Sequence, residues 1–400
     1  MEWKITNIGS LCNRVCSGGT PKSINNAYYN GNIPWLNTKE VNFNRIYDTE
    51  KNITQLGLEN SSAKWISENS VIVAMYGATA GKVAITKIPI TTNQACCNLS
   101  INSEIADYNF VYYFLCSKFY ELSSLANGGA QQNLNAQIIK DFPIKIPVNL
   151  SDQRKIAGIL SALDSKIENN NKINANLEAQ AQALFKSWFV DFTPFKDQPF
   201  VDSELGPIPQ GWKVGKLGDY VEIKRGGSPR PIQKFLTSQG LNWLKISDAT
   251  STQSPFIFNI KEKIIINGLK KTVFLKAGSL VLSNSATPCI PKFLSIDSCI
   301  HDGWLYFPHS QLPKNYLYLF FKLMRNNLVS KANGSVFLNL KTDIVKNQVF
   351  AFSGEEIYNS FDKIIAPLFK EIENLTYETF QLSALRDTLL PKLMSGEIKL

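Results

Sequence analysis

The sequence contains few of the side chains that enzymes and metalloproteins most often use. Only two of its 400 residues are histidines, His301 and His309, and neither lies at the spacing of a zinc motif or of a Ser-His-Asp triad. The seven cysteines are an odd number, and the adjacent Cys96 and Cys97 cannot bridge without strain. We therefore expect reduced thiols, no metal site and no catalytic residue in this chain.

Signals for nucleotides and membranes are also missing. Residues 77–83 have one residue too few between their glycines for a phosphate-binding loop, and no Ser or Thr follows Lys82. No Gly-x-Gly-x-x-Gly fingerprint and no Asn/Asp-Pro-Pro-aromatic tetrapeptide of an amino-methyltransferase occurs. There is no run of about eighteen apolar residues and no apolar leader after Met1. The sequence predicts a cytoplasmic protein.

Basic residues exceed acidic ones, and the excess lies in the second half of the chain. The 42 lysines and arginines against 33 aspartates and glutamates give a net charge of +9. Residues 207–350 carry 19 basic and 7 acidic side chains, whereas residues 1–150 carry 12 and 10, and residues 351–400 carry 5 and 8. This contrast favours a nucleic-acid partner over an ordinary solvated basic face.

The chain contains an internal duplication with an offset of about 208 residues. Short motifs of the first half return in the same order in the second half, and the offset drifts by only a few residues. The clearest matches are Gly18-Gly19-Thr20-Pro21 with Gly226-Gly227-Ser228-Pro229, Trp35-Leu36 with Trp243-Leu244, and Ile167-Glu168-Asn169 with Ile372-Glu373-Asn374.

Each repeat combines two hydrophobic patterns. In residues 1–150, short β-branched stretches such as 70–74 predict strands, and helical segments are predicted at about 108–125 and 315–331. From Ser151 the apolar residues follow a 3.5-residue period instead. We therefore predict an α+β protein in which two similar mixed α/β domains are each followed by a long helix.

The two long helices carry matching apolar stripes. One stripe is typical of an amphipathic helix packed on its own domain, but two stripes in register with the duplication favour an antiparallel two-helix coiled coil. The residues predicted to pair the helices are Ile156, Leu160, Leu163, Ile167, Leu177, Leu184, Phe361, Ile365, Leu368, Ile372, Leu382 and Leu389.

Polar residues interrupt both stripes. Asn170, Asn174, Thr379 and Arg386 occupy stripe positions, where polar groups weaken a core but penalise wrong registers. Pro367 is predicted to kink the second helix or to mark its start.

The predicted helix pair would act as a ruler. Residues 156–188 rise about 50 Å as a helix. Because each module precedes its helix, an antiparallel pair would hold one module at each end, related by a pseudo-twofold axis. Modules held in this way could read two half-sites on one face of B-DNA, whose helical turn is about 34 Å.

Polar loops rich in glycines, amides and cations recur at matching places in the two halves. They cover residues 17–22 and 225–230, 37–40 and 245–248, 75–82 and 283–292, and 127–135 and 333–341. Such loops can bond base edges and phosphates, although ordinary turns have the same composition. The residues predicted to bind DNA are Lys22, Thr38, Lys39, Tyr76, Thr79, Lys82, Gln131, Gln132, Asn133, Arg225, Arg230, Lys245, Ser283, Asn284, Lys292, Asn339 and Lys341.

Three further motifs resemble those of one family. They are ELGPIPQGW at 204–212, LFKSWFVDF at 184–192 and LLPKLMSGEI at 389–398. With the duplication, they make the whole chain similar to the specificity subunits of type I restriction-modification systems. The expected parts are a first target-recognition domain at 1–150, a spacer helix at 151–192, a linker at 193–211, a second target-recognition domain at 212–352 and a second spacer helix at 353–400.

The resemblance implies a non-catalytic subunit that selects the DNA sequence for an enzyme complex. Its partners would be double-stranded DNA, two modification (methyltransferase) subunits and, in the full complex, restriction subunits. S-adenosylmethionine, ATP and magnesium would bind to those partner subunits. Each domain would read one half of a bipartite, asymmetric target, and the helices would set the spacer between the halves.

Three alternatives remain open at the level of sequence. A specificity chain of another restriction-methyltransferase type would share this layout. A coiled-coil scaffold protein would show no salt-dependent DNA binding, and an autonomous nuclease would cleave DNA with a divalent metal and no partner.

Overall fold

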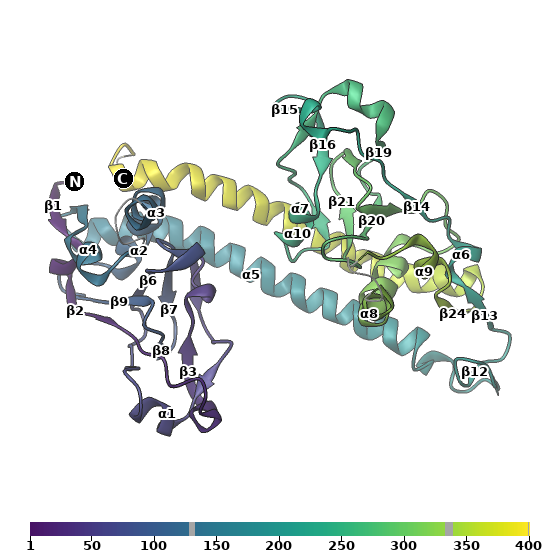
Figure 1. The fold of residues 1–400 in the computed structure, drawn as a ribbon, viewed down its shortest axis with the longest axis horizontal. Coiled ribbons are helices and arrows are strands. Elements are labelled where there is room, and N and C mark those ends of the chain that lie inside the picture. Colours follow the sequence, from purple (N-terminus) through teal and green to yellow (C-terminus); the bar gives the residue numbers. More distant parts are fainter. Residues whose placement is uncertain (128–132, 333–338, 399) are drawn as a thin grey trace. The chain divides into compact units, whose positions relative to one another are not determined.

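The computed structural model describes residues 1–127, 133–332, 339–398 and 400. They form two compact units, Met1–Lys166 with Leu382–Leu400 and Ile167–Gln381. Each unit contains one mixed α/β module together with part of helix α5 (Leu150–Phe189) and part of helix α10 (Glu355–Ser395) (Figure 1). The compact units therefore divide both long helices, a division that the predicted domain boundaries do not show.

A five-stranded sheet forms the centre of the first module. Its strands, in spatial order, are β2 (Cys12–Ser17), β9 (Cys96–Ile101), β6 (Val71–Ala74), β7 (Val83–Thr86) and β4 (Asn44–Ile46). All neighbours are antiparallel except β4 and β7, which are parallel. The central strands β6 and β7 are buried along their whole length, as expected for continuous apolar runs covered on both faces.

Smaller sheets and short helices complete this module. Strand β3 (Tyr29–Leu36) pairs with β5 (Asn52–Ile53) and, in parallel, with β8 (Thr91–Thr92), while β1 (Trp3–Asn7) pairs with β10 (Pro143–Pro147). The helices are α1 (Gln55–Glu59), α2 (Tyr108–Ser117), α3 (Phe119–Asn127) and α4 (Ala136–Asp141). Asp107 caps α2 by accepting the Phe110 N–H at 3.0 Å, so the helical segment predicted near 108–125 starts at a capped position.

The second module repeats the topology of the central sheet. Its five-stranded sheet has the order β14 (Lys224–Arg225), β23 (Trp304–Tyr306), β20 (Leu280–Ser283), β21 (Pro291–Leu294) and β17 (Phe256–Ile257). Within this sheet only the β17–β21 pair is parallel, just as only β4 and β7 are parallel in the five-stranded sheet of the first module. The remaining strands are β13 (Lys213–Lys216), β15 (Leu236–Thr237), β16 (Leu241–Leu244), β18 (Lys263–Ile264), β19 (Val273–Leu275), β22 (Ser298–Ile300) and β24 (Val349–Phe352).

Strand register reproduces the sequence offset. Trp35 pairs with Thr91 in the parallel β3–β8 ladder, and Trp243 pairs with Cys299 in the parallel β16–β22 ladder. Adding 208 to both residue numbers of the first pair gives the second pair. The helices of the second module are α6 (Leu217–Tyr220), α7 (Ile246–Thr250), α8 (Lys314–Ala332) and α9 (Thr342–Lys346), and residues 193–211 contain β11 (Phe200–Val201) and β12 (Ile208–Pro209).

Within each unit, α5 and α10 contribute to one hydrophobic core. In the first unit Ile156, Leu160 and Leu393 belong to a core shared with the module. In the second unit Phe185 of α5 contacts Phe361 of α10 with ring centroids 6.1 Å apart, again within the module's core. The predicted stripe residues are buried or half-buried. The assignment of individual residues to helix pairing stays a prediction.

Helix α10 differs from the expectation at Pro367. The helix neither starts nor ends there; it begins at Glu355, twelve residues earlier, directly after Gly354 with its positive φ of 94°. Proline costs the helix one backbone hydrogen bond, but Ile365 and Phe369 on either side of it are buried in the core. Packing therefore carries the helix through the proline.

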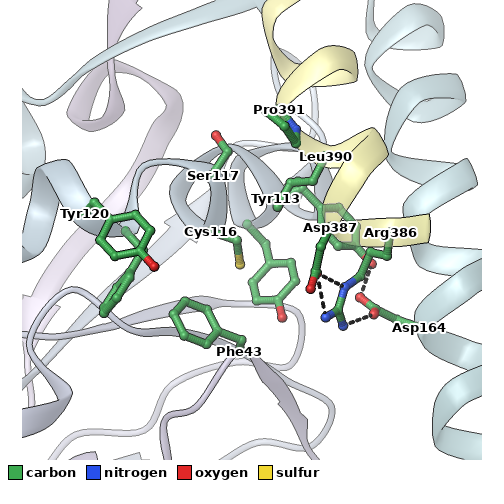
Figure 2. A pocket seen from close by; sticks show the side chains of 12 residues that line it. Phe43, Tyr113, Cys116, Ser117, Tyr120, Asp164, Arg386, Asp387, Leu390 and Pro391 are labelled. Carbon is green, nitrogen blue, oxygen red and sulfur yellow. Dashed lines mark hydrogen bonds and ion pairs between the residues drawn. The ribbon is translucent and has the colours of Figure 1, made fainter. Parts of the chain in front are cut away.

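The arginine in the second stripe has a partly buried partner. Arg386 donates to Asp164 Oδ1 at 2.8 Å and also bonds the more exposed Asp387 (Figure 2). The Tyr113 hydroxyl donates to Asp164 Oδ2 at 2.6 Å, and burial raises the pKa of this tyrosine well above its usual value. These groups line a cavity of about 450 Å³ in the first unit. The charge of Arg386 is thus neutralised by a side chain of α5.

Of the helices in the described part of the chain, none combines the length and the apolarity that a membrane span requires.

Candidate nucleic-acid interface

A tight turn at residues 93–95 connects three of the predicted loops in the first module. Asn93 closes the turn, because its Oδ1 accepts the Ala95 N–H at 3.1 Å. The Asn93 N–H donates to the carbonyl of Leu36 at 3.0 Å, at the end of β3. The Met75 N–H donates to the carbonyl of Ala95 at 2.8 Å, and Leu134 N–H in turn donates to the carbonyl of Met75 at 3.1 Å. We call residues 93–95 the first hub turn.

The second module builds the same turn from different residues. His301 Nδ1 accepts the Gly303 N–H at 2.8 Å, in the place of Asn93. The Asn284 N–H donates to the carbonyl of Gly303 at 2.9 Å, and the Leu340 N–H donates to the carbonyl of Asn284 at 2.7 Å. Burial lowers the pKa of His301, which favours the neutral ring that can accept this bond. We call residues 301–303 the second hub turn.

A glycine loop approaches each hub turn closely. A Cβ on Gly18 would lie 2.0 Å from the carbonyl oxygen of Thr92, and one on Gly226 would lie 2.2 Å from the carbonyl oxygen of His301. Neither position can accommodate a side chain. The next glycine donates its N–H in both cases, Gly19 to Thr92 at 2.9 Å and Gly227 to Ile300 at 3.3 Å. The duplicated glycine pairs therefore serve to bring the loops at 17–22 and 225–230 onto the hub turns.

The side chain at the middle of each hub turn bonds the glycine loop. In the first module Thr20 donates its hydroxyl to Gln94 Oε1. In the second module Ser228 donates its hydroxyl to Asp302 Oδ1 at 2.6 Å. Gln94 was not among the predicted DNA-binding residues, nor was Asp302. The offset of 208, which relates 20 to 228 and 94 to 302, was the signal that could have found this pair.

Two arginines surround Asp302. Arg230 Nη2 lies 3.0 Å from Asp302 Oδ2, and Arg225 Nε donates to the Asp302 backbone carbonyl at 2.5 Å. The hydrogen bond from Ser228, together with the two guanidinium groups, lowers the pKa of Asp302. The side chain of Arg230 remains 79% exposed, so most of its donors face solvent. This cluster presents positive charge at the edge of the second module.

The remaining predicted residues of the first module lie at several kinds of site. Lys22 and Asn133 are exposed, and Tyr76 is 40% exposed. Lys39 is exposed and forms an ion pair with Glu50. The structure places Thr38, Thr79 and Lys82 at half-buried positions, with Lys82 donating to Asn42 Oδ1 at 2.7 Å. Gln131 and Gln132 lie outside the described residues.

The second module requires three corrections. Ser283, Asn284 and Lys292 are at most 5% exposed, so their side chains cannot reach a duplex from this structure. Lys292 Nζ donates to the backbone carbonyls of Thr252 and Ser254 at 2.8 and 2.5 Å. The three corrected residues lie in or next to the paired strands β20 and β21, which are buried at every position, and composition alone does not reveal this.

The other predicted residues of the second module lie at the surface. Lys341 is exposed and Asn339 is half-exposed. Lys245 is half-exposed and forms an ion pair with Glu262. With Arg225 and Arg230, these residues can still contact a ligand.

The chain matches a known family over both repeats. The family is described as "Type I restriction modification DNA specificity domain", and the matched residues are 1–179 and 209–380. Two copies of a domain that combines paired sheets, a hub turn and a long helix thus account for most of the chain. The chain belongs to this family, the specificity subunits of type I restriction-modification systems.

Two curated relatives match along nearly their full length. The chain is 28% identical to the type I restriction enzyme MjaIX specificity subunit of Methanocaldococcus jannaschii, over 100% of this chain and 94% of the relative. It is 23% identical to the HindI specificity subunit of Haemophilus influenzae, over 99% of this chain and 100% of the relative. The crystal structure of a type I S subunit from M. genitalium has a TM-score of 0.61 and 16% identity, over 98% of this chain and 96% of that chain. The predicted family and fold class are confirmed.

Proposed function

We propose that this chain selects the DNA sequence for a type I restriction-modification complex, with each module reading one half of a bipartite, asymmetric target. The observation that carries this function is the pair of hub turns. The backbone bonds from Met75 to Ala95 and from Leu134 to Met75 recur as bonds from Asn284 to Gly303 and from Leu340 to Asn284. The side chains that the two turns present differ between the modules. One recognition architecture with two sets of side chains suits two different half-sites.

Electrostatics would supply much of the affinity in the second module. Residues 207–350 carry a net charge of +12, whereas residues 1–150 carry +2. Phosphate contacts by lysine and arginine release counterions, so affinity should fall steeply with salt. The first module would depend more on individual cations, such as the exposed Lys22.

Catalysis is assigned to partner subunits. Two modification subunits would pack on the helices α5 and α10 and on nearby module surface, and restriction subunits would complete the nuclease. S-adenosylmethionine, ATP and magnesium would bind to those partners. Methylation of a base requires it to leave the stack, so the modification subunits would flip the target base while this chain holds the register.

A module exchange tests the function. Residues 1–150 are replaced by the corresponding module of another family member, and the chain is expressed with its modification subunit. Mapping of methylated sites should show one half of the target changed and the other half unaltered. A change in both halves would contradict independent reading by the two modules.

The same preparation separates the competing functions. Binding of duplex DNA that is insensitive to salt, or no binding, would favour the coiled-coil scaffold. DNA cleavage by the chain alone with a divalent metal would favour the autonomous nuclease. The mass of the co-purified partner would distinguish a separate modification subunit from a fused restriction-methyltransferase.

A further inference from the structure

We propose that the middle residues of the two hub turns, Gln94 and Asp302, determine which base each module accepts. Gln94 would contact a base edge directly, with adenine preferred, and Asp302 would be a positioning residue that directs Arg230 to a guanine. This inference rests on the proposed function and adds to it two residues outside the predicted DNA-binding set.

Three independent contacts show that positions 94 and 302 are equivalent. Parallel ladder pairs at the same offset of 208 immediately precede both turns. Each turn is closed by the preceding side chain, Asn93 or His301, which accepts an N–H two residues later. A hydroxyl of the glycine loop then bonds the middle side chain in both modules. Gln94 and Asp302 are therefore different side chains at the same position of the same backbone turn.

The hub turns connect the loops that carry the exposed polar residues. Backbone bonds tie the first turn to Leu36 and Met75, and through Met75 to Leu134. These bonds fix the backbone that presents Gln94 relative to the other loops, and the bond from Thr20 orients its amide. Preorganised polar groups of this kind discriminate better than mobile ones, because less entropy is lost on binding.

Gln94 has the chemistry for direct reading of a base. Its side chain is exposed, and Thr20 donates to Oε1, which orients the amide group. The second lone pair of Oε1 and the two Nε2 donors are then available at known positions. A glutamine amide can accept from adenine N6 and donate to N7, and no other base in the major groove offers that pair.

Asp302 acts through its arginines. A carboxylate would repel phosphates if it stood alone, but here it accepts from Ser228 and lies 3.0 Å from Arg230 Nη2. One guanidinium nitrogen is used for positioning, and the other donors stay available in a fixed fork. Such a fork matches the O6 and N7 acceptors of guanine. In the first module the position that corresponds to Arg230 is Lys22, whose ammonium group lacks the planar fork of a guanidinium.

Reciprocal variants of the full chain, expressed with the modification subunit, test the inference. Gln94→Ala should relax one base position in the half-site read by the first module, with discrimination reduced on the order of 10- to 100-fold. Asp302→Asn keeps the size and can still accept from Ser228, but it removes the charge that directs Arg230. It should relax one position in the other half-site only. Methylated sites are mapped, and methylation rates are compared on duplexes that differ at single positions.

Matched controls separate reading from folding. Gln137→Ala removes an amide that bonds Asp141 within helix α4, and it should leave the target unchanged. Thr20→Ser is the conservative variant, because it retains the hydroxyl that the second module uses, and its base preference should lie closer to the wild type than that of Thr20→Val. Thr20→Val removes the bond to Gln94 and should reproduce part of the Gln94→Ala effect. Loss of stability would lower methylation at every site alike, whereas loss of reading changes the preferred base in one half.

The outcomes distinguish the two levels of the argument. If the wild-type complex yields no bipartite target, the proposed function itself fails. If the wild-type target is bipartite but Gln94→Ala and Asp302→Asn leave every position unchanged, or alter both halves equally, the assignment of the hub turns is wrong. Relaxation in one half by each variant, in opposite halves, supports it.

Discussion

At the scale of single residues, burial decides what a charged group can do. Lys292 was expected at a DNA-binding surface, yet it is 5% exposed and bonds two backbone carbonyls. Burial lowers the pKa of this lysine to about 8. A cation placed in this way costs folding free energy instead of attracting phosphate, because its charged form is poorly solvated.

This burial predicts a specific pH dependence of stability. The pKa of Lys292 is lower in the folded chain than the usual value of about 10.4 in the unfolded chain, so the unfolded chain binds more protons between these values. Stability relative to Lys292→Met should therefore rise with pH by about 2 kcal/mol between pH 8 and pH 10. Urea denaturation at both pH values measures the difference. The exposed Lys270→Met is the control, and parallel profiles of wild type and Lys292→Met would refute the prediction.

At the scale of elements, buried polar groups between α5 and α10 lower the stability of the helix pair but penalise shifted pairings. Asn174 of α5 donates to Thr376 of α10 at 3.2 Å, and Asn170 donates to Glu378 at 2.8 Å. Both asparagines are buried, and the Oδ1 atom of each has no hydrogen-bond partner among the described residues. An unsatisfied buried acceptor is costly, but a polar seam position penalises shifted pairings. The two asparagines therefore favour this pairing of α5 with α10 at some cost in stability.

A substitution at Asn174 tests this balance. Asn174→Leu removes the unsatisfied oxygen, while Thr376 keeps bonds to Ser254 and to the Ile372 carbonyl. We expect a gain of about 1 kcal/mol in the free energy of unfolding, measured by urea denaturation. Asn171→Leu, at an exposed position of the same helix, should change the value by less than about 0.5 kcal/mol. A lower free energy of unfolding for Asn174→Leu would show that the hydrogen bond to Thr376 stabilises the fold by more than the unsatisfied Asn174 Oδ1 costs.

At the scale of the whole molecule, both long helices belong to both compact units. Each helix is continuous through the point where the units divide, after Lys166 in α5 and after Gln381 in α10. If the modules read two half-sites, the length of these helices is the quantity that would fix the spacer. This expectation follows from the duplication and is tested by changing that length alone.

A paired insertion provides the test. Seven residues inserted after Lys166 together with seven after Gln381 keep both stripes in phase and lengthen the helices by about 10.5 Å. The spacer of the methylated target should widen by about 3 base pairs, at about 3.4 Å each, with both half-sites retained. The single insertion in α5 is the control, since it makes α5 about 10.5 Å longer than α10 without a matching change in its partner, and it should impair the complex. An unchanged spacer with the paired insertion would exclude the ruler.

Properties that repeat along the chain were determined by the sequence alone. The duplication, the fold class, the family and the two long helices follow from periodicity and from matched motifs, and these signals do not depend on distant contacts. Pro367 is the exception among them, since it was one predicted start of the second helix, whereas the helix begins at Glu355 and Ile365 and Phe369 are buried on either side of the proline. Local preference is a weak signal wherever a buried face stabilises the element.

Only the tertiary structure decided which polar residues share a site. The hub turns arise from backbone bonds between segments far apart in the chain, such as Met75 with Ala95 and Asn284 with Gly303. Composition predicted the polar loops but could not distinguish an exposed lysine from a buried one, as Lys292 shows. Gln94 is distinguished by the backbone bonds that connect its turn to the other loops, and the sequence does not show these bonds. Which way a side chain faces depends on the strand that presents it and the neighbours that cover it, and these are set by long-range packing rather than by residue type.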